Sequence, residues 1–283
     1  MTQKNEEKLK FSAEISKVLQ LMIHSLYTNK DIFLRELVSN ASDACDKLRY
    51  AALTEPSLIE GDSNLAITIE VNQEQKTLTI SDNGIGMSRE ELIANLGTIA
   101  KSCTQEFISQ ITGDAKKDMP LIGQFGVGFY SSFMVADKVS VISSKAGANE
   151  SFLWESEGLG EFTIATTEKA ARGTQITLHL KEGSDDYLDN FRLRHIVQTY
   201  SDHISFPIYL LGEDKNEEQI NTASAIWMRP KNEISEEQYT EFYHHVSHLM
   251  GNPWLTLHNK AEGKLEYTSL LFVPSSKPVD LFH

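Results

Sequence analysis

Three polar side chains in the segment ELVSNASDACDKLR are spaced so that they could act together. Glu36, Asn40 and Asp43 stand at i, i+4 and i+7, a spacing that brings side chains to one side of a helix. A carboxylate and a carboxamide one turn apart can hold a water molecule and an oxygen-preferring cation such as Mg²⁺. The same pattern also fits a helix face that only contacts solvent. The spacing alone leaves both interpretations open.

Two glycine-rich turns form a second chemical signal, SDNGIGMS at 81–88 and GQFGVGF at 123–129. Glycine permits positive φ and lets a ligand approach the backbone closely. The N–H groups of such turns, together with the N-terminus of a following helix, can surround a phosphate. The first turn could also be an ordinary strand-to-helix connection, for which Asp-Asn-Gly is common. The presence of a second such turn favours a phosphate site.

The two familiar nucleotide motifs are absent from this sequence. A P-loop would need glycine where Ala100 precedes Lys101, and again at Asn95. The G-x-G-x-x-G pattern fails because its third glycine position holds Arg89 in the first turn and Ser131 in the second. A nucleotide site here would therefore belong to another class.

The elements that must position these residues begin with helices. Apolar spacing predicts one helix over 12–26, capped by Ser12, and a second over 31–50 that carries the polar stripe. Alternation in 67–71 and 78–80 predicts a hairpin. Ser88 and Glu91 form a capping box that opens a helix over 89–96. The polar, glycine-punctuated segment 97–128 is too long for an ordinary connection and is a candidate lid.

Strand patterns dominate the next part of the chain, at 139–143, 151–154, 162–166 and 174–180, followed by a helix over 187–200. Helices followed by strands with hairpin-length connections predict an α+β fold, a two-layer sandwich in which helices cover a mostly antiparallel sheet. The charged run EDKNEEQ begins a linker, so we expect domains at 1–212 and 223–283 with the linker at 213–222. The second, truncated α/β segment should contain a strand at 224–228, a helix over 235–250 and a strand at 266–273.

Composition restricts the classes of function. The chain has 283 residues, 40% hydrophobic and 23% charged, which is typical of globular proteins of roughly two domains. No apolar run approaches the ~18 residues of a membrane span. A net charge of −14 opposes nonspecific binding to nucleic acid or anionic lipid. Two cysteines, Cys45 and Cys103, and an N-terminus without an apolar run indicate a reduced, cytoplasmic protein.

Five motifs together resemble one family. ELVSNASDACDKLR at 36–49, DNGIGM at 82–87, LGTIAKS at 96–102, IGQFGVGFYS at 122–131 and RGTQI at 172–176 occur in the order and spacing of the heat-shock protein 90 chaperone family, bacterial HtpG type. The matched part is its N-terminal Bergerat-type ATP-binding domain, which gyrases, MutL proteins and histidine kinases share in outline. Residues after about 223 resemble the start of the family's middle domain. The resemblance covers the whole chain, which has less than half of the family's usual length.

The resemblance implies a role for each matched residue. Asp82 would accept a hydrogen bond from the adenine amino group, supported through water by Thr174. Asn40 would bind Mg²⁺ through its side-chain oxygen, and Glu36 would be the catalytic residue that orients or deprotonates the attacking water. Cys103 stands where the family has glycine, which leaves the hinge of the lid in doubt. The full set implied to bind ATP or ADP is Asn40, Asp43, Asp82, Gly86, Met87, Asn95, Lys101, Gly123, Gln124, Phe125, Gly126, Val127, Gly128, Phe129 and Thr174.

The resemblance also implies a function, namely ATP hydrolysis to ADP and phosphate that closes the lid and helps unfolded or partly folded client proteins to fold. Its catalytic arginine comes from a part of the middle domain not included in these residues, so turnover should be weak. The full-length protein would be a homodimer and this fragment a monomer, with neither nucleic acid nor membrane as a partner. The alternatives are a DNA topoisomerase or mismatch-repair type ATPase with the same pocket, which the acidic charge opposes, and a nucleotide-binding module without turnover.

Overall fold

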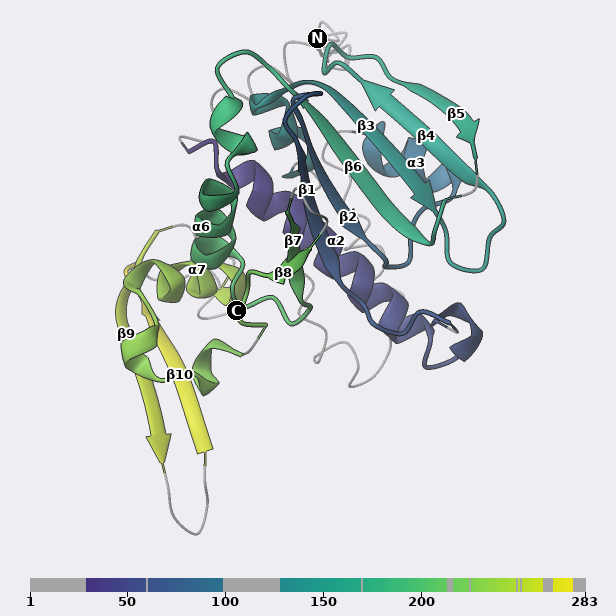
Figure 1. The fold of residues 1–283 in the computed structure, drawn as a ribbon. Coiled ribbons are helices and arrows are strands. Elements are labelled where there is room, and N and C mark those ends of the chain that lie inside the picture. Colours follow the sequence, from purple (N-terminus) through teal and green to yellow (C-terminus); the bar gives the residue numbers. More distant parts are fainter. Residues whose placement is uncertain are drawn as a thin grey trace, which may run out of the picture.

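The computed structural model describes residues 29–59, 61–98, 128–168, 170–212, 216–223, 225–247, 249, 251–261 and 267–276. Within them, eight strands form one sheet in the order β5-β4-β3-β6-β2-β1-β7-β8 (Figure 1). Neighbouring strands are antiparallel except for β1 and β7, which are parallel. The strands are β1 (Ile67–Asn72), β2 (Thr77–Asp82), β3 (Ala136–Ser144), β4 (Ser151–Ser156), β5 (Thr163–Thr167), β6 (Gly173–Leu180), β7 (Ile208–Leu211) and β8 (Glu217–Gln219).

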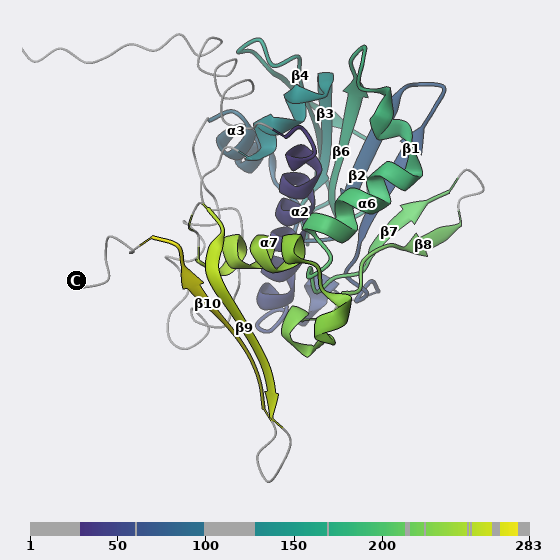
Figure 2. The same cartoon turned by 90° about the vertical axis from the view of Figure 1, so that its left-hand side faces the viewer.

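Helices cover one face of this sheet (Figure 2). They are α2 (Ile32–Ala51), α3 (Arg89–Leu96) and α6 (Asn190–Tyr200). The apolar side of α2 is buried against the strands, and this contact forms the main core. The predicted α+β class and the mostly antiparallel sheet are therefore confirmed. The core residues at this contact include Phe33, Leu34, Leu37, Val38, Ala41, Cys45, Leu48, Ile67, Ile69, Leu78 and Ile80.

Local signals placed most elements within a few residues. The hairpin of β1 and β2 and the strands β3 to β6 all lie where alternation predicted them. The capping box is also confirmed, because the Ser88 side chain accepts from the Glu91 N–H while the Glu91 carboxylate accepts from the Ser88 N–H. Helix α6 begins at Asn190 rather than near Tyr187, because Tyr187 belongs to a separate 3-10 turn, Asp185–Leu188.

Two short apolar segments differ from what the sequence predicted. The strand β7 was not predicted, and its position beside β1 comes from a parallel contact between distant parts of the chain. The strand expected at 224–228 is wrong, because Ile226–Met228 forms a 3-10 turn closed by the Arg229 N–H on the Ile226 carbonyl. Pro230 follows directly and has no N–H to donate to a sheet.

The charged run expected as a linker is partly built into the sheet. β8 pairs with β7, and the buried Asn221 accepts from the Ile208 N–H and donates to the carbonyls of Ile204 and Phe206. The following part contains α7 (Glu236–Ser247), β9 (Pro253–Ala261) and β10 (Tyr267–Pro274), around a small core of Ile226, Ile234 and Phe242. The boundaries 1–212, 213–222 and 223–283 stay a prediction. The helix expected over 12–26 and nearly all of the candidate lid lie outside the described residues.

Candidate functional site

The polar stripe of α2 lies inside the fold. Asp43 is 3% exposed, and Glu36 and Asn40 are half-buried. One oxygen of Glu36, Oε1, accepts a hydrogen bond of 2.7 Å from Arg35 Nη2. The other oxygen, Oε2, faces Gly128, where an added Cβ would lie only 2.2 Å away. A helix face that contacts only solvent is thereby excluded, and Glu36 meets the end of the second glycine-rich turn as the family resemblance expects.

Asp82 and Thr174 are brought together by strand pairing, since they lie directly opposite each other on β2 and β6. Asp82 Oδ1 accepts a hydrogen bond of 2.9 Å from the Gly84 N–H. Burial raises the pKa of Asp82 to about 7, although the N–H groups of Gly84 and Thr174 and the charge of Arg172 lower it. Around neutral pH, this carboxyl group therefore exists in both protonation states.

Two glycines of the first turn are required by packing. Gly84 lies against the backbone of α2, where an added Cβ would come within 2.5 Å of the Ala44 carbonyl carbon. Gly86 has a φ of +64°, and its Cβ would lie 2.0 Å from the Ser144 carbonyl oxygen. The approach of Gly84 brings the end of β2 onto α2, and that of Gly86 brings the turn against the end of β3. Burial raises the pKa of the Cys45 thiol on α2, and the nearby charge of Asp82 raises it further.

Ser143 on β3 is a residue of the site that the sequence did not reveal. Its side chain is completely buried and accepts a hydrogen bond of 2.8 Å from the Met87 N–H. The same hydroxyl shares a hydrogen bond of 2.9 Å with Thr174 Oγ1 and donates to the Gly173 carbonyl at 3.1 Å. Ser143 thus holds Met87 and Thr174 in place. The only sequence signal is a serine at the end of a strand pattern, which many strands share.

Asn95 and Phe129 are also among the described residues. Asn95 on α3 donates through Nδ2 to Met87 Sδ at 3.8 Å, and both side chains are half-buried. Phe129 is buried, and its ring packs edge-on against Trp154 with centroids 5.6 Å apart. Six residues that the resemblance implies lie outside the described part: Lys101, Gly123, Gln124, Phe125, Gly126 and Val127.

The donor set fits an adenine nucleotide with Mg²⁺. A buried carboxyl group and a hydroxyl can hydrogen-bond a base, a thioether supplies an apolar wall, and the Asn40 carboxamide offers the kind of oxygen that Mg²⁺ prefers. No group of three or more His, Cys, Asp or Glu side chains that could hold a metal ion occurs among the described residues. A cation would therefore depend on Asn40 and on the phosphates. Across the same part of the chain, no helix is long and apolar enough to cross a membrane.

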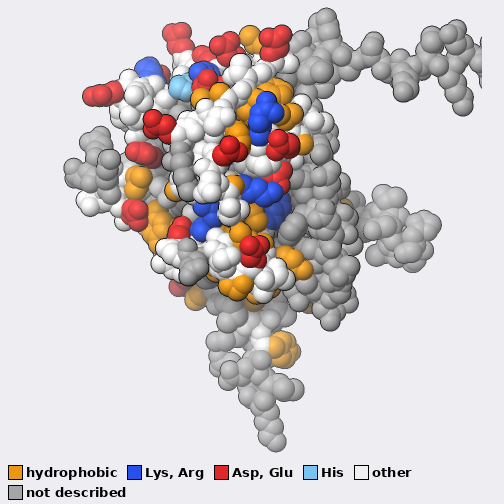
Figure 3. Space-filling model, turned by 90° about the vertical axis from the view of Figure 1, so that its right-hand side faces the viewer, with side chains coloured by type: hydrophobic (Ala, Val, Ile, Leu, Met, Phe, Trp, Pro, Cys, Tyr) orange, Lys and Arg blue, Asp and Glu red, His pale blue; other side chains and the backbone are white. Residues whose placement is uncertain are grey.

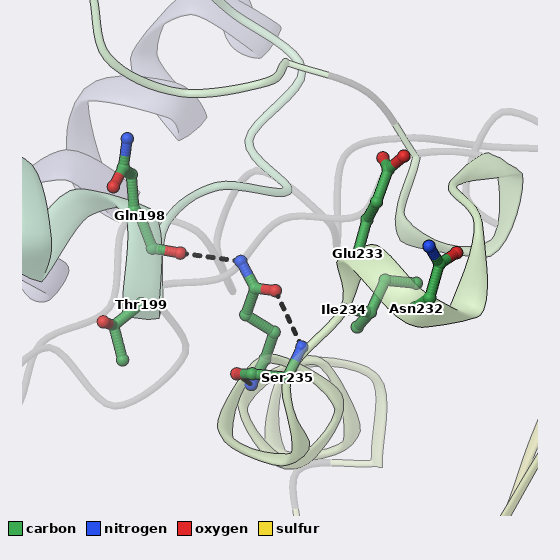
Figure 4. Close-up of a pocket in the computed structure, with 7 residues that line it drawn as sticks. Gln198, Thr199, Asn232, Glu233, Ile234 and Ser235 are labelled. Atoms are coloured by element: carbon green, nitrogen blue, oxygen red, sulfur yellow. Dashed lines mark hydrogen bonds between the residues drawn. The ribbon is translucent and has the colours of Figure 1, made fainter.

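A separate hollow of about 350 Å³ lies between the end of α6 and the start of α7 (Figure 4). Gln238 crosses it, donating through Nε2 to the Gln198 carbonyl at 2.9 Å and accepting from the Ser235 N–H at 3.1 Å. None of the residues implied to bind nucleotide lines this hollow. Its hydrogen bonds connect the two parts of the chain.

Two family models match the chain. The model described as "Histidine kinase-, DNA gyrase B-, and HSP90-like ATPase" matches residues 27–180, which include α2, both glycine-rich turns and Thr174. The model described as "Hsp90 protein" matches residues 212–283. The first match, together with the sheet covered by helices on one face, confirms the Bergerat-type fold.

Similar full-length proteins carry the name "Chaperone protein HtpG". That of Paramagnetospirillum magneticum is 62% identical over 278 residues, which cover 98% of this chain and 45% of the relative. Those of Rickettsia typhi and Rickettsia massiliae are 60% and 59% identical over 280 residues, with the same coverage of 98% and 45%. The chain thus spans less than half the length of these curated relatives. It belongs to the histidine kinase-, DNA gyrase B- and HSP90-like ATPase family and, within it, to the HSP90 proteins of the bacterial HtpG type.

Proposed function

We propose that this chain is the ATP-binding and ATP-hydrolysing part of a molecular chaperone. The observation that carries the proposal is the pairing of Asp82 with Thr174 at the ends of β2 and β6, next to a helix whose inward side bears Glu36, Asn40 and Asp43. This arrangement combines a base-binding carboxyl group with side chains suited to phosphate and Mg²⁺. The family matches and the HtpG relatives support the same conclusion.

Asp82 selects adenine in this proposal. Its ionised carboxylate offers only acceptor oxygens, and one of these accepts from the exocyclic amino group. A base without this donor would leave the buried acceptor unpaired, which is costly and therefore selective. Thr174, held by Ser143, assists through water, while Met87 and Gly86 border the ring.

Glu36 and Asn40 act at the phosphate end. Asn40 binds Mg²⁺, which supplies charge neutralisation for the phosphates, and Asp43 supports the polar surface beside it. Glu36 orients or deprotonates the water that attacks the γ-phosphate. Gly128 packs closely against Glu36 Oε2, and a side chain at position 128 would collide with this oxygen. The backbone N–H groups of 123–129 and the side chains of Asn95 and Lys101 contact phosphates and ribose.

The whole protein uses this reaction to close a lid and to help unfolded or partly folded proteins in the cytoplasm, acting as a homodimer. The 283-residue chain itself is monomeric. It also hydrolyses ATP slowly, because the arginine that the family resemblance implies is not among its residues. Such an arginine is worth about 10³ to 10⁵ in rate. A DNA-dependent ATPase is disfavoured by the net charge of −14, although the face in Figure 3 carries basic side chains near its centre as well as acidic ones around them.

Calorimetric titration with ADP, with and without Mg²⁺, tests the proposal. The unaltered chain should bind ADP, and Asp82→Asn should abolish binding. In the full-length protein, Glu36→Ala should keep binding and lose hydrolysis. Normal ADP binding by Asp82→Asn would show that the adenine assignment is wrong.

A further inference from the structure

Arg172, the residue directly before β6, ties together two segments that lie far from it in the sequence. Its Nε donates to the Asn83 carbonyl at 2.9 Å, its Nη1 to the Leu58 carbonyl at 3.0 Å and its Nη2 to the Asp62 carbonyl at 2.9 Å. The Nη2 also donates to Asp62 Oδ2 at 3.1 Å, and the side chains of Arg172 and Asp62 are 15% and 52% exposed. Three of these four acceptors are uncharged carbonyls. The largely buried guanidinium therefore meets a carboxylate only at its exposed end.

The backbone holds this guanidinium next to Asp82. Asn83, whose carbonyl accepts from Arg172, follows Asp82 directly in the first glycine-rich turn. Gly173 lies against the Asp82 carbonyl, where an added Cβ would come within 1.9 Å of the oxygen. The Asn83 side chain donates through Nδ2 to Asp62 Oδ2 at 3.0 Å, the same oxygen that accepts from Arg172. The turn that carries Asp82 is thus fixed on both sides, with the charge of Arg172 beside it.

Two groups among the described residues interact electrostatically with Asp82, namely Arg172 and the Cys45 thiol of α2. Burial raises the pKa of Asp82 to about 7, and the charge of Arg172, after two backbone N–H groups, lowers it. Burial, followed by the charge of Asp82, raises the pKa of Cys45, so this thiol is neutral near pH 7. Of the two groups, Arg172 is therefore the one whose charge favours the ionised form of Asp82.

The protonation state of Asp82 decides which bases it can pair with. Oδ1 accepts from the Gly84 N–H at 2.9 Å, so a proton on this carboxyl group sits on Oδ2. When ionised, Oδ2 only accepts hydrogen bonds, which suits the amino group of a 6-amino purine. When protonated, Oδ2 donates, which suits the carbonyl of a 6-oxo purine. An ionised Asp82 facing that carbonyl would leave two buried acceptors without a donor, which is costly.

We propose that Arg172 is a specificity-determining residue, which favours 6-amino over 6-oxo purine nucleotides by keeping Asp82 a hydrogen-bond acceptor. This inference rests on the proposed function, in which Asp82 contacts the base. Arg172 acts through Asp82 and does not itself touch the nucleotide in this proposal. Its three carbonyl partners hold the guanidinium in place without neutralising it, so its charge remains available to Asp82.

The test compares ADP with inosine 5′-diphosphate, whose base carries a carbonyl group in place of the amino group. Calorimetry at about pH 6 and about pH 8 gives the ratio of the ADP affinity to the inosine diphosphate affinity. Protonation of the shared diphosphate cancels in this ratio. With a pKa of about 7, the ionised fraction of Asp82 falls about tenfold between the higher and the lower pH. The ratio for the unaltered chain should fall about tenfold with it.

Four variants connect this ratio to Arg172. Arg172→Met should lower the ratio about twofold to tenfold at the higher pH, because loss of a nearby positive charge raises the pKa of a carboxyl group. Arg172→Lys keeps the charge and should retain the ratio better than Arg172→Met. Asp62→Asn removes the carboxylate that opposes Arg172 and should raise the ratio about twofold at the lower pH. Arg194→Met on α6 is the matched control, because Arg194 bonds the exposed Glu218 and should leave the ratio unchanged.

A purely structural role for Arg172 would weaken the binding of both nucleotides equally and leave the ratio constant. Equal ratios for Arg172→Met and Arg194→Met, or a ratio for the unaltered chain that does not change with pH, would overturn the inference alone. If Arg172→Met does not fold, Asp62→Asn decides, since an unchanged ratio in that variant has the same consequence. If the unaltered chain binds no ADP at either pH, the proposed function fails and this inference fails with it.

Discussion

Replacing Ser143 with alanine removes one hydroxyl group from the point where β3, β6 and the first glycine-rich turn meet at the candidate adenine pocket. That hydroxyl accepts from the Met87 N–H and bonds Thr174 Oγ1 and the Gly173 carbonyl, at 2.8, 2.9 and 3.1 Å. Thr174 can rotate its hydroxyl to another acceptor, but the Met87 N–H is fixed by the backbone. Its loss of a partner dominates the cost, because a buried donor without an acceptor costs about 1–3 kcal/mol.

We therefore expect Ser143→Ala to lower the free energy of unfolding by about 2 kcal/mol. ADP should also bind more weakly, since Met87 and Thr174 lose their shared support. Urea titration measures the first effect and calorimetry the second. Ser140→Ala is the control on the same strand, because Ser140 bonds Glu155 and His179 and makes no contact with Met87 or Thr174. Equal unfolding free energies for the two variants would refute the role given to Ser143.

Three further predictions concern packing, pH and the contact between the two parts of the chain. Gly84→Ala should lower the free energy of unfolding, measured by urea titration, by about 3 kcal/mol or more, because its Cβ would overlap the α2 backbone. Gly212→Ala should have little effect, because the nearest atom to its Cβ would be 3.7 Å away. The raised pKa of Asp82 means that the folded state binds its proton more tightly than the unfolded state. The free energy of unfolding should therefore fall by roughly 2–3 kcal/mol as the pH rises from 5 to 7.5, and Asp82→Asn should remove this part of the slope. Arg229→Met leaves the buried Asp202 without its ion pair and should lower stability by about 3 kcal/mol. The loss should appear as faster amide exchange over 236–247, and unchanged exchange there would contradict a stabilising role for this ion pair.

Signals that act over a few residues were sufficient for much of the fold. Alternating apolar residues located β1 to β6, and the Ser88 and Glu91 pair located the start of α3. These predictions succeed because the atoms that satisfy the backbone lie within the same element or the same hairpin. The short strand β7 could not be found in this way, since its four residues pair with β1, more than 130 positions earlier in the chain.

The sequence by itself determined which residue types are available for chemistry. The stripe of Glu36, Asn40 and Asp43 and the two glycine-rich turns left more than one interpretation open, and only the resemblance of five motifs in order indicated the family. This is possible because nucleotide binding requires particular side chains at particular backbone conformations, and these appear directly as letters and spacings.

Only the tertiary structure decided how these groups are held. It turned the stripe of α2 inward, paired Asp82 with Thr174, placed Ser143 behind both, and brought Glu241 of α7 to Arg35. Each of these contacts joins residues from different elements, and its geometry depends on how the strands order themselves and on how closely Gly84 allows β2 to approach α2. Burial raises the pKa of Asp82 and shields the ion pairs of Arg35. It depends on how the elements pack and cannot be derived from the spacing of residues along the chain.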